Sequence, residues 1–184
     1  MGEEKKPNTD DLEKGAGQKV DMKKEILSWV FYIAFVLVLT WVIITFVGQR
    51  TRVDGRSMMN TLHDGDNLIV EKLSYRFSDP KRFDIIVFPP TGKKEYYIKR
   101  IIGLPGETVQ IDENGNIYIN GELLEENYGA ETIQNPGRAA KPITLGDDEY
   151  FVMGDNRNNS KDSRSEEVGN VKRSQIIGRA WLRI

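Results

Sequence analysis

The chain has 184 residues, with 26 basic and 28 acidic side chains that leave a formal net charge of −2. Because the charges nearly cancel, the chain has no basic field to steer it toward nucleic acid, which is therefore not an expected partner. The sequence contains no cysteine, which excludes disulfides, a thiolate nucleophile and a cysteine-ligated metal site.

The N-terminal quarter combines a polar tail with one apolar segment. Residues 1–25 mix lysines with acidic residues and contain few large apolar side chains, so they predict a disordered tail. Residues 26–47 carry neither charge nor proline, and as a helix they would span about 33 Å, enough to cross a hydrocarbon core of about 30 Å. The segment is apolar on all sides and no small-x-small cleavage pattern follows it, so we interpret it as a retained membrane anchor rather than a core helix or a cleavable export signal. Since cations flank both ends, the charges alone leave its orientation open.

Residues 48–184 show the pattern of an all-β domain. Short apolar and β-branched runs are separated by Gly, Pro, Asn and Asp, with no sustained helical periodicity. Strands are predicted at residues 67–73, 83–88, 96–102, 109–111, 117–119, 122–124, 150–153 and 176–184. Two Asn-Gly dipeptides divide the fourth, fifth and sixth of these strands and predict a compact meander. The polar stretch 127–142 predicts a loop.

Elimination narrows the possible chemistry. His63 is the only histidine, so a Ser-His-Asp triad could be built only around it, and a histidine-rich zinc site is excluded. Asp64 and Asp66 sit in a Gly-containing and Asn-containing stretch that favours a turn over a catalytic carboxylate pair. Residues 155–159 lack the third ligand and the glycine of a calcium loop, so neither a metal nor another cofactor is expected.

A serine activated by a lysine remains, in which a neutral amine takes the hydroxyl proton. Ser57 is the candidate nucleophile and Lys99 the candidate base. Tyr97 and Ile101 share the face of the predicted strand that carries Lys99, and this apolar surface should lower the pKa of the amine, because desolvation disfavours the ammonium form. Either residue taken alone is more often structural than catalytic, and spacing does not decide between the two roles.

Three segments, residues 55–62, 97–107 and 150–164, resemble the signature boxes of bacterial type I signal peptidases. Their order, their spacing and the apolar segment before them agree with that family, and the likeness runs from about residue 26 to about residue 180. The resemblance implies a signal-peptidase-like β-domain, related to that of LexA-type repressors, behind one N-terminal transmembrane helix. It is similar to the short form typical of Gram-positive bacteria.

The resemblance implies that Ser57 attacks the scissile carbonyl and that Lys99 is the general base. The implied reaction removes signal peptides from exported preproteins, with cleavage after small residues in an Ala-x-Ala-like pattern. The implied partners are signal peptides, the lipid bilayer and the protein-export translocon, with no cofactor. The implied location is a bacterial cell membrane, with the N-terminus in the cytoplasm and residues 48–184 outside.

The third box also implies supporting roles. Ser160 resembles the residue that hydrogen-bonds and orients the lysine amine, and Asp155, Asp162 and Arg164 resemble the charged support that holds the loop.

Two positions depart from the family pattern. Asn60 stands where proline is usual, which removes a φ restraint and is expected to loosen the turn that carries Ser57. Gly55 stands where some members carry a hydroxyl group for the oxyanion, so here the oxyanion hole must use backbone N–H groups, chiefly that of Ser57.

We expect the substrate to bind as an added β-strand between residues 51–55 and 96–98, with shallow pockets for small side chains. The expected substrate contacts are Val53, Gly55, Met58, Tyr97 and Ile98. An extended link from residue 47 to residue 57 reaches at most about 33 Å, which keeps the nucleophile near the bilayer. A self-cleaving repressor-type protease is disfavoured, because such proteins carry a DNA-binding domain where this chain has an apolar segment. A non-catalytic anchored module that binds exported peptides remains as the alternative.

Overall fold

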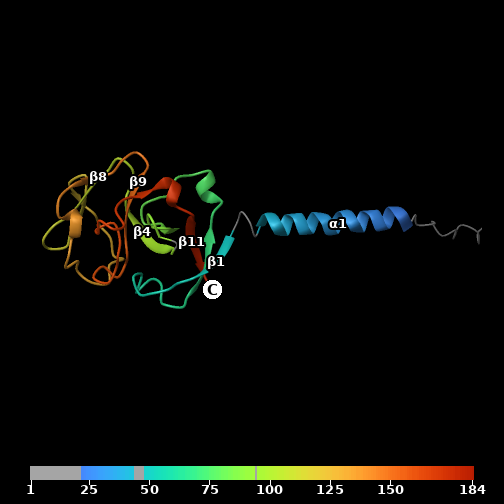
Figure 1. The fold of residues 1–184 in the computed structure, drawn as a ribbon, viewed down its shortest axis with the longest axis horizontal. Helices are drawn as coiled ribbons and strands as arrows, with labels where there is room; N and C mark the ends of the chain where they lie inside the picture. Colours follow the sequence, from blue (N-terminus) through green and yellow to red (C-terminus); the bar gives the residue numbers. More distant parts are fainter. Residues whose placement is uncertain (1–21, 44–47, 94) are drawn as a thin grey trace, which may run out of the picture. The chain divides into compact units, whose positions relative to one another are not determined.

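A computed structural model describes residues 22–43, 48–93 and 95–184 (Figure 1). They belong to two compact units, one that ends at Trp41 and one that runs from Val42 to Ile184.

The first unit contains helix α1, Met22–Val42, which is long and apolar enough to cross a membrane and has no buried residue. It begins four residues before the predicted span, since Lys23, Lys24 and Glu25 are good helix formers and an acid in the first turn suits the helix dipole. Residues 22–25, predicted as tail, are therefore helical. The rest of the predicted tail and residues 44–47 lie outside the described residues.

The larger sheet of the second unit has, within the described residues, seven antiparallel strands in the order β1-β2-β11-β3-β4-β9-β10. Their bounds are β1 Gly48–Arg52, β2 Asn67–Glu71, β3 Ile85–Phe88, β4 Tyr97–Gly103, β9 Glu149–Met153, β10 Val171–Lys172 and β11 Gly178–Arg183. Strand β4 therefore lies between β3 and β9, well inside the sheet, and its residues 99–103 are all buried.

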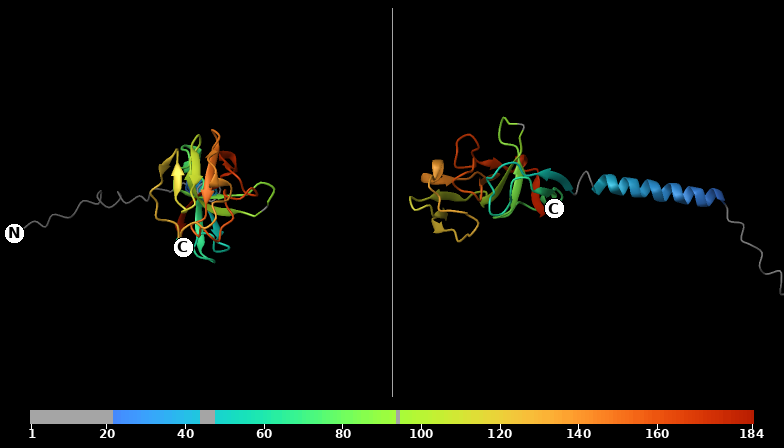
Figure 2. Two further views of the ribbon diagram at one scale, coloured as in Figure 1. Left: turned by 90° about the vertical axis from the view of Figure 1, so that its left-hand side faces the viewer. Right: turned by 90° about the horizontal axis from the view of Figure 1, so that it is seen from below.

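A second sheet has four described strands in the order β7-β6-β5-β8, namely β5 Thr108–Ile111, β6 Ile117–Ile119, β7 Glu122–Leu123 and β8 Ile143–Thr144. The predicted meander is confirmed, with positive φ at Gly115, Asn120 and Gly121 in its two turns. The strands of this sheet lie at the end of the β-domain remote from β1 (Figure 2). Short 3₁₀ turns occupy Ser74–Arg76, Gly137–Ala140 and Arg173–Gln175. The all-β fold class is confirmed.

Three strands were not predicted. β1 has the sequence Gly-Gln-Arg-Thr-Arg and pairs with β2 along all five residues, but as an edge strand it shows no apolar alternation. β8 and β10 have two residues each, too short to leave a periodic signal. In addition, the strand expected over 176–184 begins only at Gly178, because a 3₁₀ turn ends at Gln175.

The two faces of β4 pack against different parts of the core. Ile101 belongs to a cluster with Ile86, Phe88 and Tyr150, with Tyr97 packed against it. Ile102 belongs to a second cluster, shared with residues of the four-stranded sheet and with Phe151 and Met153. Successive side chains of a strand point to opposite faces, so Lys99 shares the side of Ile101 and Arg100 shares that of Ile102.

Candidate active site

Ser57 lies in a turn that follows β1 and is fixed from both sides. Val53 begins the turn, with its N–H donating to Asp66 O at 2.8 Å. The N–H of Gly55 donates to Asp64 Oδ1 at 2.9 Å, and Gly55 has φ +94°, a value that glycine adopts at little cost. Beyond Ser57, Met58 is buried in a small cluster with Val53. The predicted turn at Asp64 and Asp66 is therefore present, and it holds the turn of Ser57.

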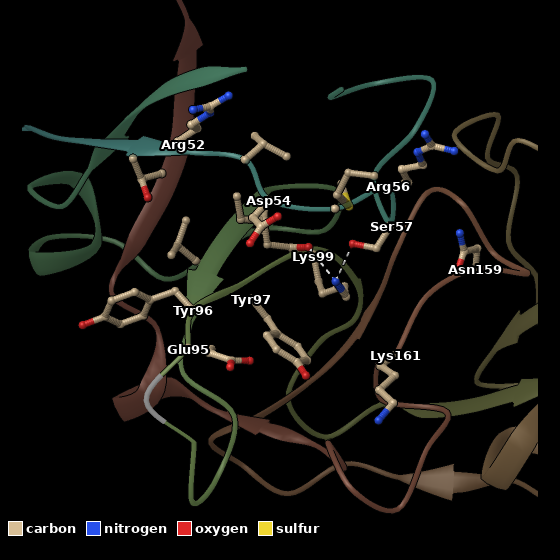
Figure 3. A pocket seen from close by; sticks show the side chains of 16 residues that line it. Arg52, Asp54, Arg56, Ser57, Glu95, Tyr96, Tyr97, Lys99, Asn159 and Lys161 are labelled. Atoms are coloured by element: carbon tan, nitrogen blue, oxygen red, sulfur yellow. Dashed lines mark hydrogen bonds between the residues drawn. The ribbon is translucent and has the colours of Figure 1, made fainter. Parts of the chain in front are cut away.

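Lys99 lies on strand β4, and its side chain extends to Ser57. Its side chain is 4% exposed and its backbone pairs with Ile86 of β3. The amine nitrogen lies 2.8 Å from Ser57 Oγ and donates to the carbonyl oxygen of Ile98 at 3.0 Å. The two side chains point toward each other at the floor of a pocket (Figure 3). This distance is short enough for direct proton transfer between the hydroxyl and the amine.

The environment of Lys99 favours its neutral form. Burial lowers the pKa of the amine from its usual value near 10.5 to about 8, and the negative charges of Asp162 and Asp155 oppose this shift without cancelling it. Among the described residues Lys99 forms no salt bridge, so desolvation dominates. The direction agrees with the effect expected from its apolar strand. An appreciable fraction of the amine is therefore available as a base near neutral pH.

The pocket around the pair has a volume of about 440 Å³. Its lining includes the five residues predicted as substrate contacts, which are Val53, Gly55, Met58, Tyr97 and Ile98. The two segments expected to flank a bound peptide therefore face one another across it. Asn159 and Lys161 of the third box also line the pocket and were not among the predicted substrate contacts.

Asp155 is fully buried and anchors the third box to β4. Arg100 donates Nε to Asp155 Oδ1 at 2.8 Å and Nη2 to Oδ2 at 2.6 Å, and the Thr61 hydroxyl donates to the same carboxylate at 2.5 Å. The guanidinium of Arg100 also stacks 3.7 Å from the ring centre of Tyr128. Arg100 was not among the predicted site residues, although a cation on the buried face opposite Lys99 requires an acidic partner.

Asp162 and Arg164 form a second buried pair. Arg164 donates Nε to Asp162 Oδ1 at 2.8 Å and Nη2 to Oδ2 at 2.9 Å. Asp162 Oδ2 also accepts a hydrogen bond from the N–H of Gly154 at 3.0 Å. Arg164 Nη2 donates a further hydrogen bond to Arg157 O at 2.5 Å. Arg157 in turn pairs with Glu126 at 2.7 Å, a contact that the sequence reading missed. Three such ion pairs therefore lie within the third box or connect it to its surroundings, and the supporting roles of Asp155, Asp162 and Arg164 stay predictions.

The structure differs from the expectation for Ser160. Its hydroxyl is buried without a hydrogen-bond partner among the described residues, and the Lys99 amine instead uses Ser57 and its own strand. Ser160 packs against Gly154, where an added Cβ would overlap both the Ser160 hydroxyl and the Ser57 carbonyl oxygen. Ser160 is therefore beside the pair, but the expected bond to the amine is absent. Its orienting role stays a prediction.

Asn60 has φ +81°, in the left-handed region that proline cannot adopt and asparagine tolerates. The N–H groups of Thr61 and Leu62 both donate to Met58 O, at 3.0 and 2.8 Å. The departure from proline therefore accompanies a hydrogen-bonded turn with a different backbone conformation, and the expectation of a looser turn is not supported.

His63 lies outside the pocket lining, exposed beside Asp66 and Arg183. Within residues 22–43, 48–93 and 95–184, no group of three or more His, Cys, Asp or Glu side chains is placed to hold a metal ion.

Comparisons with known proteins identify the family of the chain. Residues 26–184 match the family described as signal peptidase, peptidase S26. The chain is 43% identical over 187 residues to a signal peptidase I of Leptolyngbya laminosa, covering 96% of this chain and 88% of the relative. It is 45% identical to a probable signal peptidase I-2 of Synechocystis sp. over 145 residues, 76% of this chain and 64% of that relative. A crystal structure of a signal peptidase I from Enterococcus faecalis is similar at 37% identity and a TM-score of 0.45, covering 55% of this chain and 97% of that one.

Proposed function

The chain belongs to the signal peptidase family, peptidase S26, and we propose that it removes signal peptides from exported preproteins with Ser57 as nucleophile and Lys99 as general base. Its family is one of serine endopeptidases. The observation that carries the proposal is the 2.8 Å distance between Lys99 Nζ and Ser57 Oγ, combined with an amine whose pKa is lowered to about 8 by burial.

In the first half of the reaction, the lone pair of neutral Lys99 takes the Ser57 proton while Oγ attacks the scissile carbonyl carbon. The oxyanion that forms accepts a hydrogen bond from the backbone N–H of Ser57. Among the described residues this N–H donates to no other group. The Lys99 ammonium then returns the proton to the leaving amine as the peptide bond breaks. The product is an acyl-enzyme on Ser57 and a released mature N-terminus.

In the second half, neutral Lys99 takes a proton from a water molecule that attacks the acyl carbon. The collapse of this second tetrahedral intermediate returns the proton to Ser57 Oγ and releases the signal peptide. One lysine thus acts as base, then acid, in each half of the cycle.

The pocket supports a preference for small side chains. Its lining includes Val53, Met58 and Val87, each no more than 4% exposed, which give it an apolar part. Residues 51–55 and 96–98 offer backbone groups to an extended peptide on either side. We propose cleavage after small residues in an Ala-x-Ala-like pattern, as membership of the signal peptidase family suggests.

Helix α1 supports a membrane-anchored enzyme, since it is long enough to span a bilayer and exposes its apolar side chains. We place the N-terminus in the cytoplasm and the β-domain outside a bacterial membrane, where signal peptides emerge from the translocon. By sequence length alone, the link from residue 47 to residue 57 reaches at most about 33 Å when extended, so we expect Ser57 to work close to the bilayer.

The test uses the full chain in detergent with a labelled preprotein. We expect Ser57→Ala to abolish cleavage, while Ser78→Ala, a matched change at an exposed serine outside the pocket lining, keeps wild-type activity. A folded Ser57→Ala protein, free of wild-type enzyme, that still cleaves would overturn the dyad. Loss of cleavage in this variant together with retained substrate binding would exclude the non-catalytic module.

A further inference from the structure

Asn156 holds both carbonyl groups that flank the nucleophile's α-carbon. Its side-chain Nδ2 donates to the carbonyl oxygen of Arg56 at 3.1 Å, and its backbone N–H donates to that of Ser57 at 3.0 Å. The Arg56 oxygen receives a second donor, the N–H of Met59, at 3.2 Å. One residue of the third box, separated from the nucleophile by about a hundred positions, therefore contacts the turn at two points.

The first of these contacts bears on the oxyanion donor. The carbonyl of Arg56 and the N–H of Ser57 belong to the same peptide unit, which is planar and trans, so the two groups point in opposite directions. A donor that fixes the carbonyl also fixes the direction of the N–H. A hydrogen bond to the carbonyl additionally polarises the unit and strengthens its N–H as a donor.

The local sequence restrains the orientation of this peptide unit only weakly. It follows Gly55, where a Cβ would meet nothing within 4 Å and whose φ is +94°. Glycine restricts the backbone torsions less than other residues do, although the Gly55 N–H is held by Asp64, and the side chain of Arg56 is exposed. Among the described residues, the hydrogen bonds that restrain this peptide unit are those that its carbonyl oxygen, Arg56 O, accepts from Asn156 and Met59.

We propose that Asn156 is a positioning residue for the oxyanion hole, in which its side-chain amide aims the Ser57 N–H at the developing oxyanion. The inference rests on the proposed function, because it assumes that Ser57 is the nucleophile. In this proposal the buried ion pairs of Asp155 and Asp162 hold the backbone that precedes Asn156. Asp155, bound by Arg100, immediately precedes Asn156, and Asp162 holds the N–H of Gly154 just before it.

The first experiment compares Asn156→Ala with wild type by kcat and KM on a labelled preprotein. Loss of a direct oxyanion donor costs about 10² to 10³ in rate, so loss of the group that aims it should lower kcat about 10- to 100-fold with KM changed less than threefold. The kcat/KM profile should keep its wild-type pKa, because the amide does not contact Lys99. An unchanged kcat, a loss confined to KM or a shifted pKa would each overturn the proposal.

Asn158→Ala is the matched control. It removes the same amide from the same loop, but its Nδ2 donates to Glu131 and to Thr132 O, away from the nucleophile. Activity within threefold of wild type is expected. An equal loss in both variants would mean that the loop as a whole, and not the bond to Arg56, is responsible.

Asn156→Asp guards against simple unfolding, since it keeps the shape and the backbone N–H but removes the side-chain donor. We expect the kcat loss of the alanine variant with a thermal midpoint within a few degrees of wild type. A peptide aldehyde, which forms a tetrahedral adduct with Ser57, should bind each variant more weakly in proportion to the kcat loss, while the product peptide binds as before. Equal weakening of both ligands would refute the assignment. Failure of the dyad itself would appear separately, as cleavage retained by Ser57→Ala.

Discussion

Two neighbouring cations on β4 have opposite surroundings. Lys99 and Arg100 are 4% and 5% exposed, and they point to opposite faces of the strand. Arg100 donates two hydrogen bonds to the buried carboxylate of Asp155, whereas Lys99 has no salt bridge among the described residues and a pKa lowered to about 8. The protein thus pairs Arg100 with a carboxylate and leaves Lys99, the proposed general base, without a salt bridge among the described residues.

This contrast separates catalysis from support within two residues. A buried cation without an ionic partner costs stability, and the same desolvation lowers its pKa, as the proposed role of Lys99 requires. A buried pair adds little net stability but is expensive to break, so it serves as a rigid link between the sheet and the third box.

Exchanging the two cations gives the largest expected effect. Lys99→Arg should lower kcat/KM by more than about 10³-fold, because a guanidinium does not deprotonate in this pH range and no base remains. Arg100→Lys keeps a positive charge beside Asp155 but loses the bidentate hydrogen bond, so we expect kcat/KM to fall by less than about tenfold. Steady-state cleavage of a preprotein measures both. Comparable losses in the two variants would contradict the division of roles.

Breaking the paired cation should have the next largest effect, on stability. Arg100→Leu leaves the carboxylate of Asp155 buried and unpaired, which should cost about 3–5 kcal/mol of unfolding free energy. Urea unfolding of the full chain in detergent, followed by tryptophan fluorescence, gives this value. The double variant Arg100→Leu with Asp155→Leu should recover most of the loss. If the single variant were as stable as wild type, the pair would not be the support described above.

Removing the unpaired cation should have a smaller effect of opposite sign. Between pH 8 and 10.5 the unfolded chain binds more protons at Lys99 than the folded protein does, so this residue's contribution to wild-type stability rises with pH in that window. Below pH 8 the wild type bears the whole cost, about 3 kcal/mol for a pKa difference of this size. Lys99→Met should therefore be about 1–3 kcal/mol more stable at pH 7, with the gain shrinking toward pH 10.5. A destabilised Lys99→Met at pH 7 would mean that the ammonium is well solvated.

Local pattern predicted the parts of the molecule that depend on neighbouring residues. The Asn-Gly turns gave the meander, and strand alternation placed Tyr97 and Ile101 on the side of Lys99. The resemblance named Ser57 and Lys99, and the structure brings their side chains into contact. Each of these features can be predicted from a few consecutive residues or from one sequence motif.

Contacts between distant residues were not predictable in the same way. The partner of Arg100 lies 55 positions away, and their meeting depends on how β4 pairs with β9, which no local pattern encodes. The edge strand β1 gave no signal because, among the described strands, it pairs on one side only. The sign of φ at Asn60 and the unpaired hydroxyl of Ser160 depend on how the turns close against each other.

The opposite faces of β4 also limit how this strand can evolve. Its ladder with β9 shifts register between Ile101 and Gly103, and a Cβ at Gly103 would overlap Val109 and crowd Leu145, so the far end of the strand is fixed. Inserting or deleting one residue between Arg100 and that point would reverse the parity of every side chain before it and turn Arg100 toward the side of Ser57. Substitutions in β4 can be gradual, but a change of one codon in this part of the strand would misplace the proposed base Lys99 and the Arg100–Asp155 pair together.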